Sequence, residues 1–326
     1  MSSYLLTGAA GFIAFRVAEF LLESGHTIYG VDNMNDAYDI RLKQYRLKRL
    51  QANPQFKFLQ EDISDRAIID RLRDWLPGDI ASVINLAARA GVRTSLTDPW
   101  VYMETNMTGT LNLLEYCRVC GIQKFVLAST SSLYAEKSKP PFNEQDDSDH
   151  PLQPYAASKK GAEVMAHVYH HLYGIDVTVL RYFTVYGPAG RPDMVMFRFC
   201  QWIAEGRPVI INGDGEQSRG FTYLDDIARG TIQALRPLGY EIINLGGHEV
   251  ITIHQLIKML EERIGKPAHV SYQDFHPADV HANQADVFRA GELLGWQPQV
   301  GLDEGVTRLV DWYMREREWV SQVETP

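Results

Sequence analysis

Short apolar runs alternate with longer segments of helical periodicity throughout the first 180 positions of the chain. The runs that predict strands are residues 4–6, "TIYGVDN", "FKFLQED", "SVINLAA" and "KFVLAST". The segments between them repeat their apolar residues every three or four positions, which predicts helices. Strands that alternate with helices pair in parallel, and the helices then cover both faces of the sheet. The pattern therefore predicts a doubly wound α/β fold.

The alternation becomes less regular after Tyr182, where turns rich in glycine and proline separate helices expected near residues 197–205, 252–264 and 306–317. One further run, "YEIINLGG", has the composition of a core strand. We therefore expect a larger, Rossmann-type domain over residues 1–182, whose sheet is completed by residues 240–246. Residues 183–326 should form mainly a smaller, interleaved lobe that binds the substrate.

A glycine-rich turn, "TGAAGFIA", follows the first strand. Gly8 and Gly11 allow a tight turn and a close approach of a pyrophosphate to the N-terminus of the next helix. Asp32 ends the second strand, where its carboxylate can accept hydrogen bonds from an adenosine ribose and repels a 2′-phosphate. This placement predicts NAD as the cofactor. Other candidates for NAD contact lie in the turn or at strand ends, namely Phe12, Ile13, Asn33, Asp62, Ile63, Leu86, Ala87 and Ala88.

Candidate catalytic side chains lie at the end of the fifth strand and on the helix that begins in "PYAASKKGAE". Tyr155 and Lys159 are one turn apart on one face of that helix. A phenol is a weak base at neutral pH, but a neighbouring ammonium group and a nicotinamide cation would stabilise the phenolate and lower its pKa. The end of the fifth strand offers a hydroxyl cluster made of Thr130, Ser131 and Ser132.

The chain resembles the extended short-chain dehydrogenase/reductase family, specifically its NAD-dependent nucleotide-sugar epimerases and dehydratases. The features that carry this resemblance are the glycine turn, the aspartate of the second strand, the hydroxyl cluster and the tyrosine–lysine spacing. The resemblance covers nearly the whole chain. It implies that Tyr155 is the general base and that Lys159 lowers the tyrosine pKa and holds the nicotinamide ribose. It also implies that Thr130, with the two serines as alternatives, hydrogen-bonds the reacting hydroxyl, and that residues 99–120 and the Tyr155 helix form a homodimer interface.

Three longer segments, "VDNMNDAYDIRLKQYRL", "AARAGVRTSLTDP" and "FTVYGPAGRPDM", are similar to the corresponding stretches of the family's UDP-glucuronic acid 4-epimerases. The resemblance implies reversible epimerisation of UDP-glucuronic acid to UDP-galacturonic acid at C4, through a transient 4-keto sugar and with bound NAD. The chain departs from the family at Ala14, where a third glycine is usual, and at Ala135, where glycine usually follows Tyr134. The first change should be mild, and the second concerns the loop above the sugar.

A uronic acid makes a particular demand on the site, because a 4-keto sugar with a carboxylate on C5 loses carbon dioxide readily. A planar guanidinium can hold that carboxylate in bidentate fashion. Arg191, in a turn stiffened by two prolines, is the candidate, and the alternatives for it are exposure to water or an ion pair with Asp193. The other candidates for substrate contact are Arg93, Thr184, Met196, Asp279 and Arg219, the last of which resembles the family's phosphate-contacting arginine.

The overall composition narrows the range of partners. A formal net charge of −9 argues against a nucleic-acid-binding surface, which needs a basic face to neutralise phosphates. No apolar stretch is long enough for a membrane span and "MSSYLLTGAAG" lacks the features of a signal peptide, so we expect a cytoplasmic protein. Three cysteines are too few for a disulfide framework. His167, His170 and His171 have no acidic or cysteine companion, so no metal site is expected.

Other functions are compatible with the same motifs. UDP-glucose 4-epimerase and UDP-glucuronate decarboxylase share the fold and the oxidation step. A catalytically silent NAD-binding sensor or scaffold is an alternative from another class. Such a protein would have no need of Tyr155, Lys159 and the hydroxyl cluster together, and we therefore favour an enzyme, an isomerase that acts on a UDP-sugar.

Overall fold

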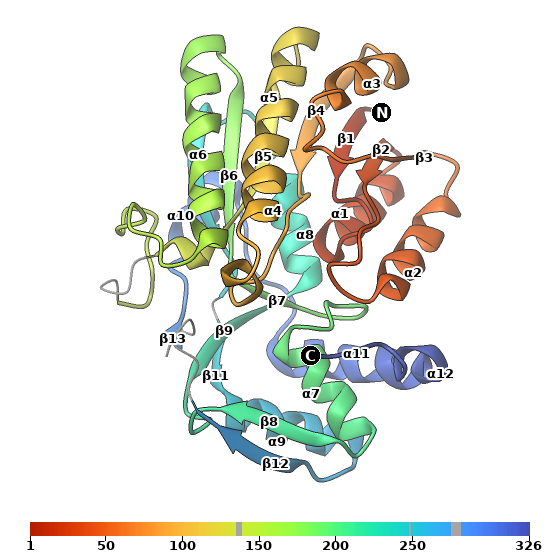
Figure 1. The fold of residues 1–326 in the computed structure, drawn as a ribbon, viewed down its shortest axis with the longest axis vertical. Helices are drawn as coiled ribbons and strands as arrows, with labels where there is room; N and C mark the ends of the chain where they lie inside the picture. Colours follow the sequence, from red (N-terminus) through yellow and green to blue (C-terminus); the bar gives the residue numbers. More distant parts are fainter. Residues whose placement is uncertain (135–138, 248, 275–281) are drawn as a thin grey trace.

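The computed structural model describes residues 1–134, 139–247, 249–274 and 282–326. Among these residues, seven strands form a large sheet in the order β10–β6–β5–β4–β1–β2–β3, and every neighbouring pair is parallel (Figure 1). The predicted doubly wound parallel sheet is confirmed. Its strands are β1 (Ser3–Thr7), β2 (Thr27–Asp32), β3 (Phe56–Gln60), β4 (Ile80–Asn85), β5 (Lys124–Thr130), β6 (Asp176–Tyr182) and β10 (Tyr240–Leu245).

Helices cover both faces of the large sheet, because side chains alternate along each strand and leave both faces apolar. In β5, Phe125 and Leu127 join one buried cluster, whereas Val126 and Ala128 join the other. The first cluster is completed by α3 (Ile68–Trp75), α5 (Gly109–Cys120) and α6 (Pro154–Tyr173). The second is completed by α1 (Phe12–Glu23), α2 (Ile40–Gln51), α8 (Leu224–Gln233) and α10 (Phe288–Leu294).

The helical run predicted for residues 99–120 is present but not uniform. It begins as α4 (Trp100–Tyr102), widens into a π-helical segment, η2 (Met103–Thr108), and continues as α5. The π-helical segment carries the buried Asn106, which donates to the Ser158 hydroxyl on α6 at 2.9 Å and to the Arg89 carbonyl at 3.0 Å. Such segments often occur near functional sites. Through the hydrogen bonds of Asn106, this one connects α6 to the loop that follows β4.

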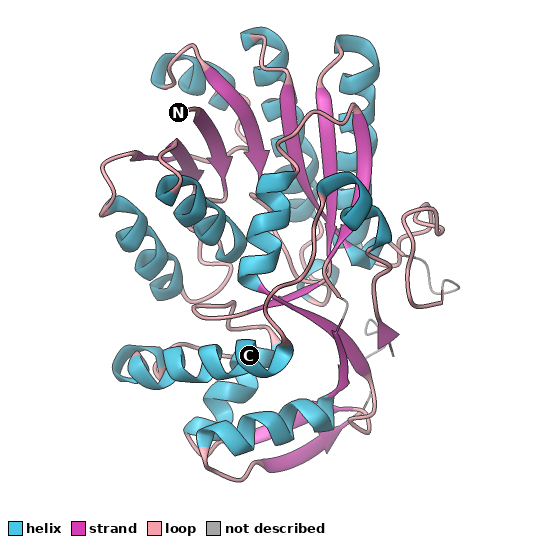
Figure 2. Cartoon of the chain, turned by 180° about the vertical axis from the view of Figure 1, so that it is seen from behind, coloured by secondary structure: helices cyan, strands magenta, loops and turns pink. Residues whose placement is uncertain are grey.

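A smaller lobe lies below the large sheet (Figure 2). In it, β9 pairs in parallel with β7 and β13 and antiparallel with β11, and β8 pairs in parallel with β12. The lobe has its own aromatic core, which includes Phe197, Phe199, Trp202 and Trp312. Its elements are β7 (Thr184–Tyr186), α7 (Val195–Ala204), β8 (Pro208–Asn212), β9 (Ser218–Tyr223), β11 (Glu249–Thr252), α9 (Ile253–Ile264), β12 (His269–Gln273), β13 (Ala282–Asn283), α11 (Leu302–Arg315) and α12 (Arg317–Val320).

The chain returns to the large sheet between elements of the smaller lobe. After β9, α8 packs with α1, and β10 then extends the sheet beside β6, with Tyr240 opposite Val177 and Leu245 opposite Tyr182. Only then do β11 and α9 resume the smaller lobe. The two parts are therefore interleaved in sequence.

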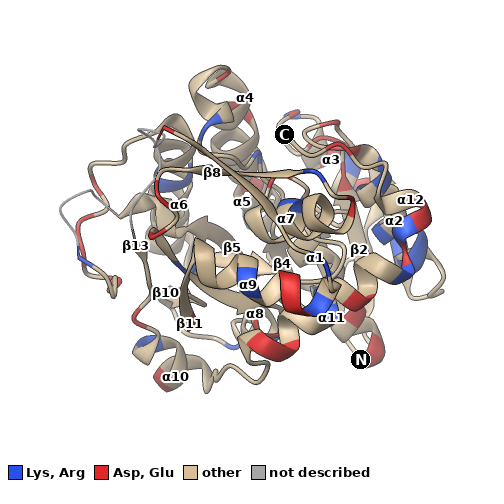
Figure 3. Cartoon of the chain, turned by 90° about the horizontal axis from the view of Figure 1, so that it is seen from below, with Lys and Arg blue, Asp and Glu red and all other residues tan. Residues whose placement is uncertain are grey.

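Charges of both signs are mixed on the surface. Figure 3 shows basic positions of α2 close to acidic positions of neighbouring elements, and Arg49 on α2 lies 3.0 Å from Glu19 on α1. Within the described part of the chain, no helix is both long and apolar enough to cross a membrane.

Gly220 in β9 provides a test of the packing between β9 and the chain after β10. A Cβ built on Gly220 would lie 2.6 Å from the carbonyl carbon of Gly247. We expect Gly220→Ala to lower the free energy of unfolding by about 1–3 kcal/mol, because backbone atoms cannot move aside without strain. Gly78→Ala is the matched control, since no described atom lies within 4 Å of a Cβ there. Urea unfolding measures both variants, and equal losses would contradict this prediction.

Candidate active site

A cavity of about 1580 Å³ lies between the ends of the large-sheet strands and the smaller lobe. It is lined by every residue predicted above for catalysis or cofactor contact. Four of the predicted substrate residues, Arg93, Thr184, Arg191 and Arg219, line it as well. The structure therefore brings together predicted residues that are up to 211 positions apart, from Gly8 to Arg219.

The glycine turn brings the backbone close to the end of β4. Gly8 has a φ of +68°, and a Cβ there would lie 2.8 Å from the backbone of Ala87. The Gly11 amide donates to the Gly8 carbonyl at 2.7 Å, which closes the turn. Gly11 is also the N-cap of α1, and among the described residues no side chain caps that helix end. A helix N-terminus without a side-chain cap, lined by glycine backbone, fits the pyrophosphate of a dinucleotide.

Asp32 is buried at the end of β2, and its two oxygens have different partners. One accepts from the Ala10 amide of the glycine turn at 3.1 Å. The other accepts from the Met34 amide at 2.8 Å and lies 3.4 Å from Nζ of Lys43. Lys43 is itself buried on α2 and donates to the side chain of Asn35 at 3.1 Å. The carboxylate is thus fixed beside the glycine turn with a cation next to it, a suitable place for ribose hydroxyls.

Asn33 and Asp62 meet across the loops after β2 and β3. The Asn33 amide donates to Asp62 at 2.7 Å, and the backbone and hydroxyl of Ser64 donate to it at 2.8 and 2.7 Å. Burial alone would raise the pKa of Asp62, but these hydrogen bonds outweigh burial and hold the pKa below its ordinary value. The end of β3 therefore presents a charged, fixed acceptor, which suits a donor such as an adenine amino group.

Tyr155, near the start of α6, and Thr130, at the end of β5, both line the cavity, and the Thr130 hydroxyl acts to lower the Tyr155 pKa. Thr130 also donates to the Ser132 hydroxyl at 3.2 Å and accepts from the Ser132 amide at 3.1 Å. Burial raises the pKa of Tyr155, and the opposing effects of Thr130 and of the Arg191 charge do not cancel it. The lowered tyrosine pKa expected from the sequence depends on the nicotinamide cation as well as on Lys159, and it stays a prediction for the NAD-bound protein.

Lys159 is only 3% exposed, and its ammonium donates to the Ala128 carbonyl of β5 at 2.9 Å. Burial lowers the pKa of Lys159 to about 8, while the negative charge of Glu163 one turn later opposes that change. Glu163 is held in turn by the Ser129 hydroxyl at 2.5 Å and by the Arg181 guanidinium at 2.8 and 3.0 Å. The lysine thus has a fixed position beneath the cavity.

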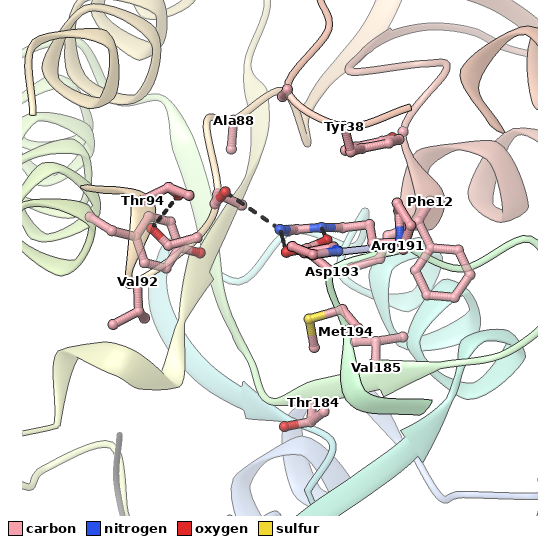
Figure 4. Close-up of a pocket in the computed structure, with 18 of the residues that line it drawn as sticks. Phe12, Tyr38, Ala88, Val92, Thr94, Thr184, Val185, Arg191, Asp193 and Met194 are labelled. Atoms are coloured by element: carbon pink, nitrogen blue, oxygen red, sulfur yellow. Dashed lines mark hydrogen bonds and ion pairs between the residues drawn. The ribbon is translucent and has the colours of Figure 1, made fainter. Parts of the chain in front are cut away.

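Arg191 lies at the cavity wall near Tyr38 and Phe12 (Figure 4). Its Nε and Nη2 donate to the two oxygens of Asp193 at 3.0 and 2.5 Å, and Nη2 lies 3.4 Å from the Ala90 carbonyl. Burial would raise the pKa of Asp193, but the Arg191 charge holds that pKa below its ordinary value. The ion pair with Asp193, one alternative considered for Arg191, is therefore present, and it exists inside the cavity rather than at the outer surface.

The comparison with known families agrees with this geometry. A family model described as GDP-mannose 4,6 dehydratase matches residues 5–309. The chain belongs to this family. Its relatives include the UDP-glucuronate 4-epimerase of Thermodesulfobacterium geofontis, which is 55% identical over 324 residues, 99% of this chain and 99% of that protein.

Solved structures are similar to the chain as well. The UDP-glucuronic acid 4-epimerase of Bacillus cereus, in complex with UDP-glucuronic acid and NAD, is 38% identical with a TM-score of 0.89, over 96% of this chain and 99% of that one. A tyrosine-to-phenylalanine variant of the same enzyme, in complex with UDP-4-deoxy-4-fluoro-glucuronic acid and NAD, has the same identity and coverage and a TM-score of 0.90.

The substrate candidates differ in where the structure places them. A guanidinium nitrogen of Arg93 lies 2.7 Å from the side chain of Asn212 across the cavity, and Arg219 donates to the Ser218 carbonyl at 2.8 Å. Met196 does not line the cavity: it is 2% exposed and packs in the core of the smaller lobe. Met194 and Val195 form that part of the wall. Asp279, like Ala135, lies outside the described residues.

Several cavity residues were not found from the sequence. Lys43 and Tyr38 fall in the segment that resembles UDP-glucuronic acid 4-epimerases, so a signal for them was available. Asn35 and Thr94 fall in such segments too, whereas Gln217 and Asn283 come from parts of the smaller lobe without that signal. Within the described ranges, no group of three or more His, Cys, Asp or Glu side chains is arranged to hold a metal ion.

Lys159→Met should show a stability difference that depends on pH. The folded-state pKa of about 8 lies below the ordinary 10.5, so the unfolded chain binds more protons between these values and stability rises with pH there. Relative to the unaltered chain, the variant should therefore lose about 3 kcal/mol of unfolding free energy between about pH 7 and pH 10.5. Denaturant unfolding at both pH values measures this, and a difference that is constant with pH would contradict it.

Proposed function

We propose that the protein is an NAD-dependent UDP-glucuronate 4-epimerase, which interconverts UDP-glucuronic acid and UDP-galacturonic acid. The observation that carries this proposal is the single cavity that unites the glycine turn, the Tyr155–Lys159 pair and the Arg191 turn. The near full-length similarity to UDP-glucuronate 4-epimerases supports it.

The cofactor is NAD, which when bound supplies a reversible two-electron oxidation at C4 of the sugar. Gly8, Gly11 and the N-terminus of α1 would hold its pyrophosphate. Asp32 would accept from the adenosine ribose, and a 2′-phosphate would face the same carboxylate and be repelled. The Bacillus cereus structures contain NAD, in agreement with this assignment.

Tyr155 is proposed to act as the base for the sugar 4-hydroxyl. It would take the hydroxyl proton when C4 is oxidised and return it when C4 is reduced on the other face, so that no external acid is needed. Thr130 orients the phenol, and the two serines of the hydroxyl cluster can donate to the sugar. Lys159, held by the Ala128 carbonyl, would place its ammonium beside the nicotinamide ribose and stabilise the phenolate.

Arg191 and Thr184 are proposed to hold the carboxylate on C5. Asp193 occupies the edge of the guanidinium formed by Nε and Nη2, and among the described residues Nη1 has no hydrogen-bond partner. That end can therefore receive a carboxylate without breaking the ion pair. Decarboxylation requires the bond from C5 to the carboxyl carbon to align with the C4 carbonyl π system, and a carboxylate fixed in another orientation avoids it. Arg93 and Arg219 are proposed to neutralise the diphosphate.

Product analysis tests the activity directly. After incubation of the protein with UDP-glucuronic acid and no added NAD, ¹H NMR should detect UDP-galacturonic acid, because the cofactor is regenerated in each cycle. A UDP-pentose with carbon dioxide would instead identify a decarboxylase, conversion of UDP-glucose alone would identify a neutral-sugar epimerase, and no conversion would favour a scaffold.

Tyr155→Phe is the variant for the same assay. It should lower the turnover rate by roughly 10²–10⁴-fold, since the base is lost, while bound NAD is retained. Tyr173→Phe, at the exposed end of the same helix, is the matched control and should leave turnover unchanged. Undiminished turnover in Tyr155→Phe would refute the assigned mechanism.

We also infer a cytoplasmic homodimer. All three cysteines are free, as suits a reducing compartment. On α6, Val164, Val168 and Leu172 recur every four residues and are all exposed. This apolar stripe lies on a helix that packs beside α5 (Figure 1), and covering it against a second copy would remove it from water.

Val168→Glu tests the dimer. A carboxylate in the centre of the apolar stripe should shift the protein toward monomer, because a buried charge without a partner is costly. Val250→Glu on β11 is the matched control, since both valines are 38% exposed. Light scattering at low micromolar concentration reports the mass. A dimer that persists in Val168→Glu, or a monomeric unaltered protein, would contradict the inference.

A further inference from the structure

Arg46, on α2, is fully buried and forms no ion pair among the described residues. Its guanidinium instead donates to neutral oxygens. Nε and Nη2 donate to the Ala189 carbonyl at 3.0 and 2.7 Å, and Nη2 lies 3.2 Å from the Gly190 carbonyl. Nη1 donates to the Ala10 carbonyl at 3.0 Å and to the Tyr38 hydroxyl at 2.7 Å. Burial of a guanidinium is costly, and here the cost is offset by a full set of acceptors rather than by a carboxylate.

These acceptors belong to two different turns. Ala189 and Gly190 lie in the turn directly before Arg191, and Ala10 lies in the glycine turn before α1. Ala189 has a φ of +54°, in the left-handed region that non-glycine residues rarely occupy. Two hydrogen bonds to its carbonyl stabilise that conformation. Arg46 therefore connects the turn before Arg191 to the glycine turn through hydrogen bonds to both.

We propose that Arg46 is a positioning residue for Arg191. Gly190, whose carbonyl accepts from Arg46, is joined to Arg191 by a planar peptide, so fixing one restrains the other. A cavity-wall residue, Phe12, packs nearby, with its ring centre 5.9 Å from the Arg46 guanidinium. The proposal rests on the proposed function, because it assumes that Arg191 contacts the sugar end of the substrate.

The position of Arg46 on α2 links the two halves of the site. Lys43, three residues earlier and on the same side of the helix, lies beside Asp32. One helix face thus supports the proposed ribose acceptor through Lys43 and the proposed sugar contact through Arg46. This gives a structural role to the end of "DIRLKQYRL", whose first residues line the cavity directly.

Arg46→Lys is the decisive variant, because lysine keeps the charge but cannot reach acceptors on both turns with a planar fork. Calorimetry would measure UDP-glucuronic acid affinity in the NAD-loaded Tyr155→Phe background, where no turnover interferes. We expect Arg46→Lys to weaken binding about tenfold, equivalent to about 1.4 kcal/mol. Arg49→Lys, one turn later on α2 and half exposed, is the matched control and should bind as the unaltered chain does.

A double-mutant cycle separates positioning from general damage. If Arg46 acts through Arg191, Arg46→Lys should cause no further loss of affinity once Arg191→Ala is present. Additive losses, or unaltered affinity in a folded Arg46→Lys protein, would overturn the proposal. If Arg46→Lys does not fold, Tyr38→Phe removes a single acceptor and should weaken binding in the same non-additive way, while unaltered or additive binding would overturn the proposal.

Amide hydrogen exchange distinguishes this proposal from the proposed function. Exchange across residues 187–194 should be faster in Arg46→Lys than in Arg49→Lys whether or not UDP-glucuronic acid is a substrate. Failure of the unaltered protein to form UDP-galacturonic acid would reject the function alone. Unchanged exchange in residues 187–194 would reject the role of Arg46 alone.

Discussion

The buried ion pair between Glu163 and Arg181 is the interaction on which the geometry of the site depends. It joins α6, which carries Tyr155 and Lys159, to β6 next to the strand that carries the hydroxyl cluster. Both side chains are almost completely buried, and a buried pair is worthwhile only when its remaining hydrogen-bonding capacity is met. Ser129 bonds the carboxylate at 2.5 Å and Ser148 bonds the guanidinium at 3.1 Å. The catalytic helix is therefore held in one register against the sheet.

Arg46 also has a buried guanidinium, but its hydrogen-bond acceptors differ from those of Arg181. Arg181 meets a carboxylate and joins a helix to a strand, both of which are regular elements. Arg46 meets only carbonyl and hydroxyl oxygens, because it joins two turns whose backbone groups are not used within a helix or strand. Arginine suits both tasks, since its planar fork has five donors. The catalytic side of the cavity is thus fixed through an ion pair, and the Arg191 side through backbone acceptors.

The sequence predicted those parts of the structure that have local signals. Strand and helix periodicity predicted the doubly wound sheet. Short motifs marked Gly8, Asp32, Tyr155 and Lys159 as candidate site residues, and all four line the cavity. The role of Arg46 could not be inferred, because its main acceptor is 143 positions away. The expected contact of Met196 failed because the start of α7 turns that side chain into the core. The sequence could not show that burial opposes the lowering of the Tyr155 pKa, because motif spacing does not report burial.

The pairing of Arg191 with Asp193 also bears on selectivity between sugars. A site rejects the wrong substrate strongly when binding that substrate leaves a charged group of the site without a partner. A site whose charged groups keep their partners rejects the wrong substrate only weakly. When a neutral sugar occupies the cavity, Arg191 keeps both hydrogen bonds to Asp193, so its charge still has a partner. Preference for a uronic acid must therefore come from attraction at the remaining end of the guanidinium. Such attraction depends on exact placement of Arg191, which is the property that Arg46 controls in our proposal.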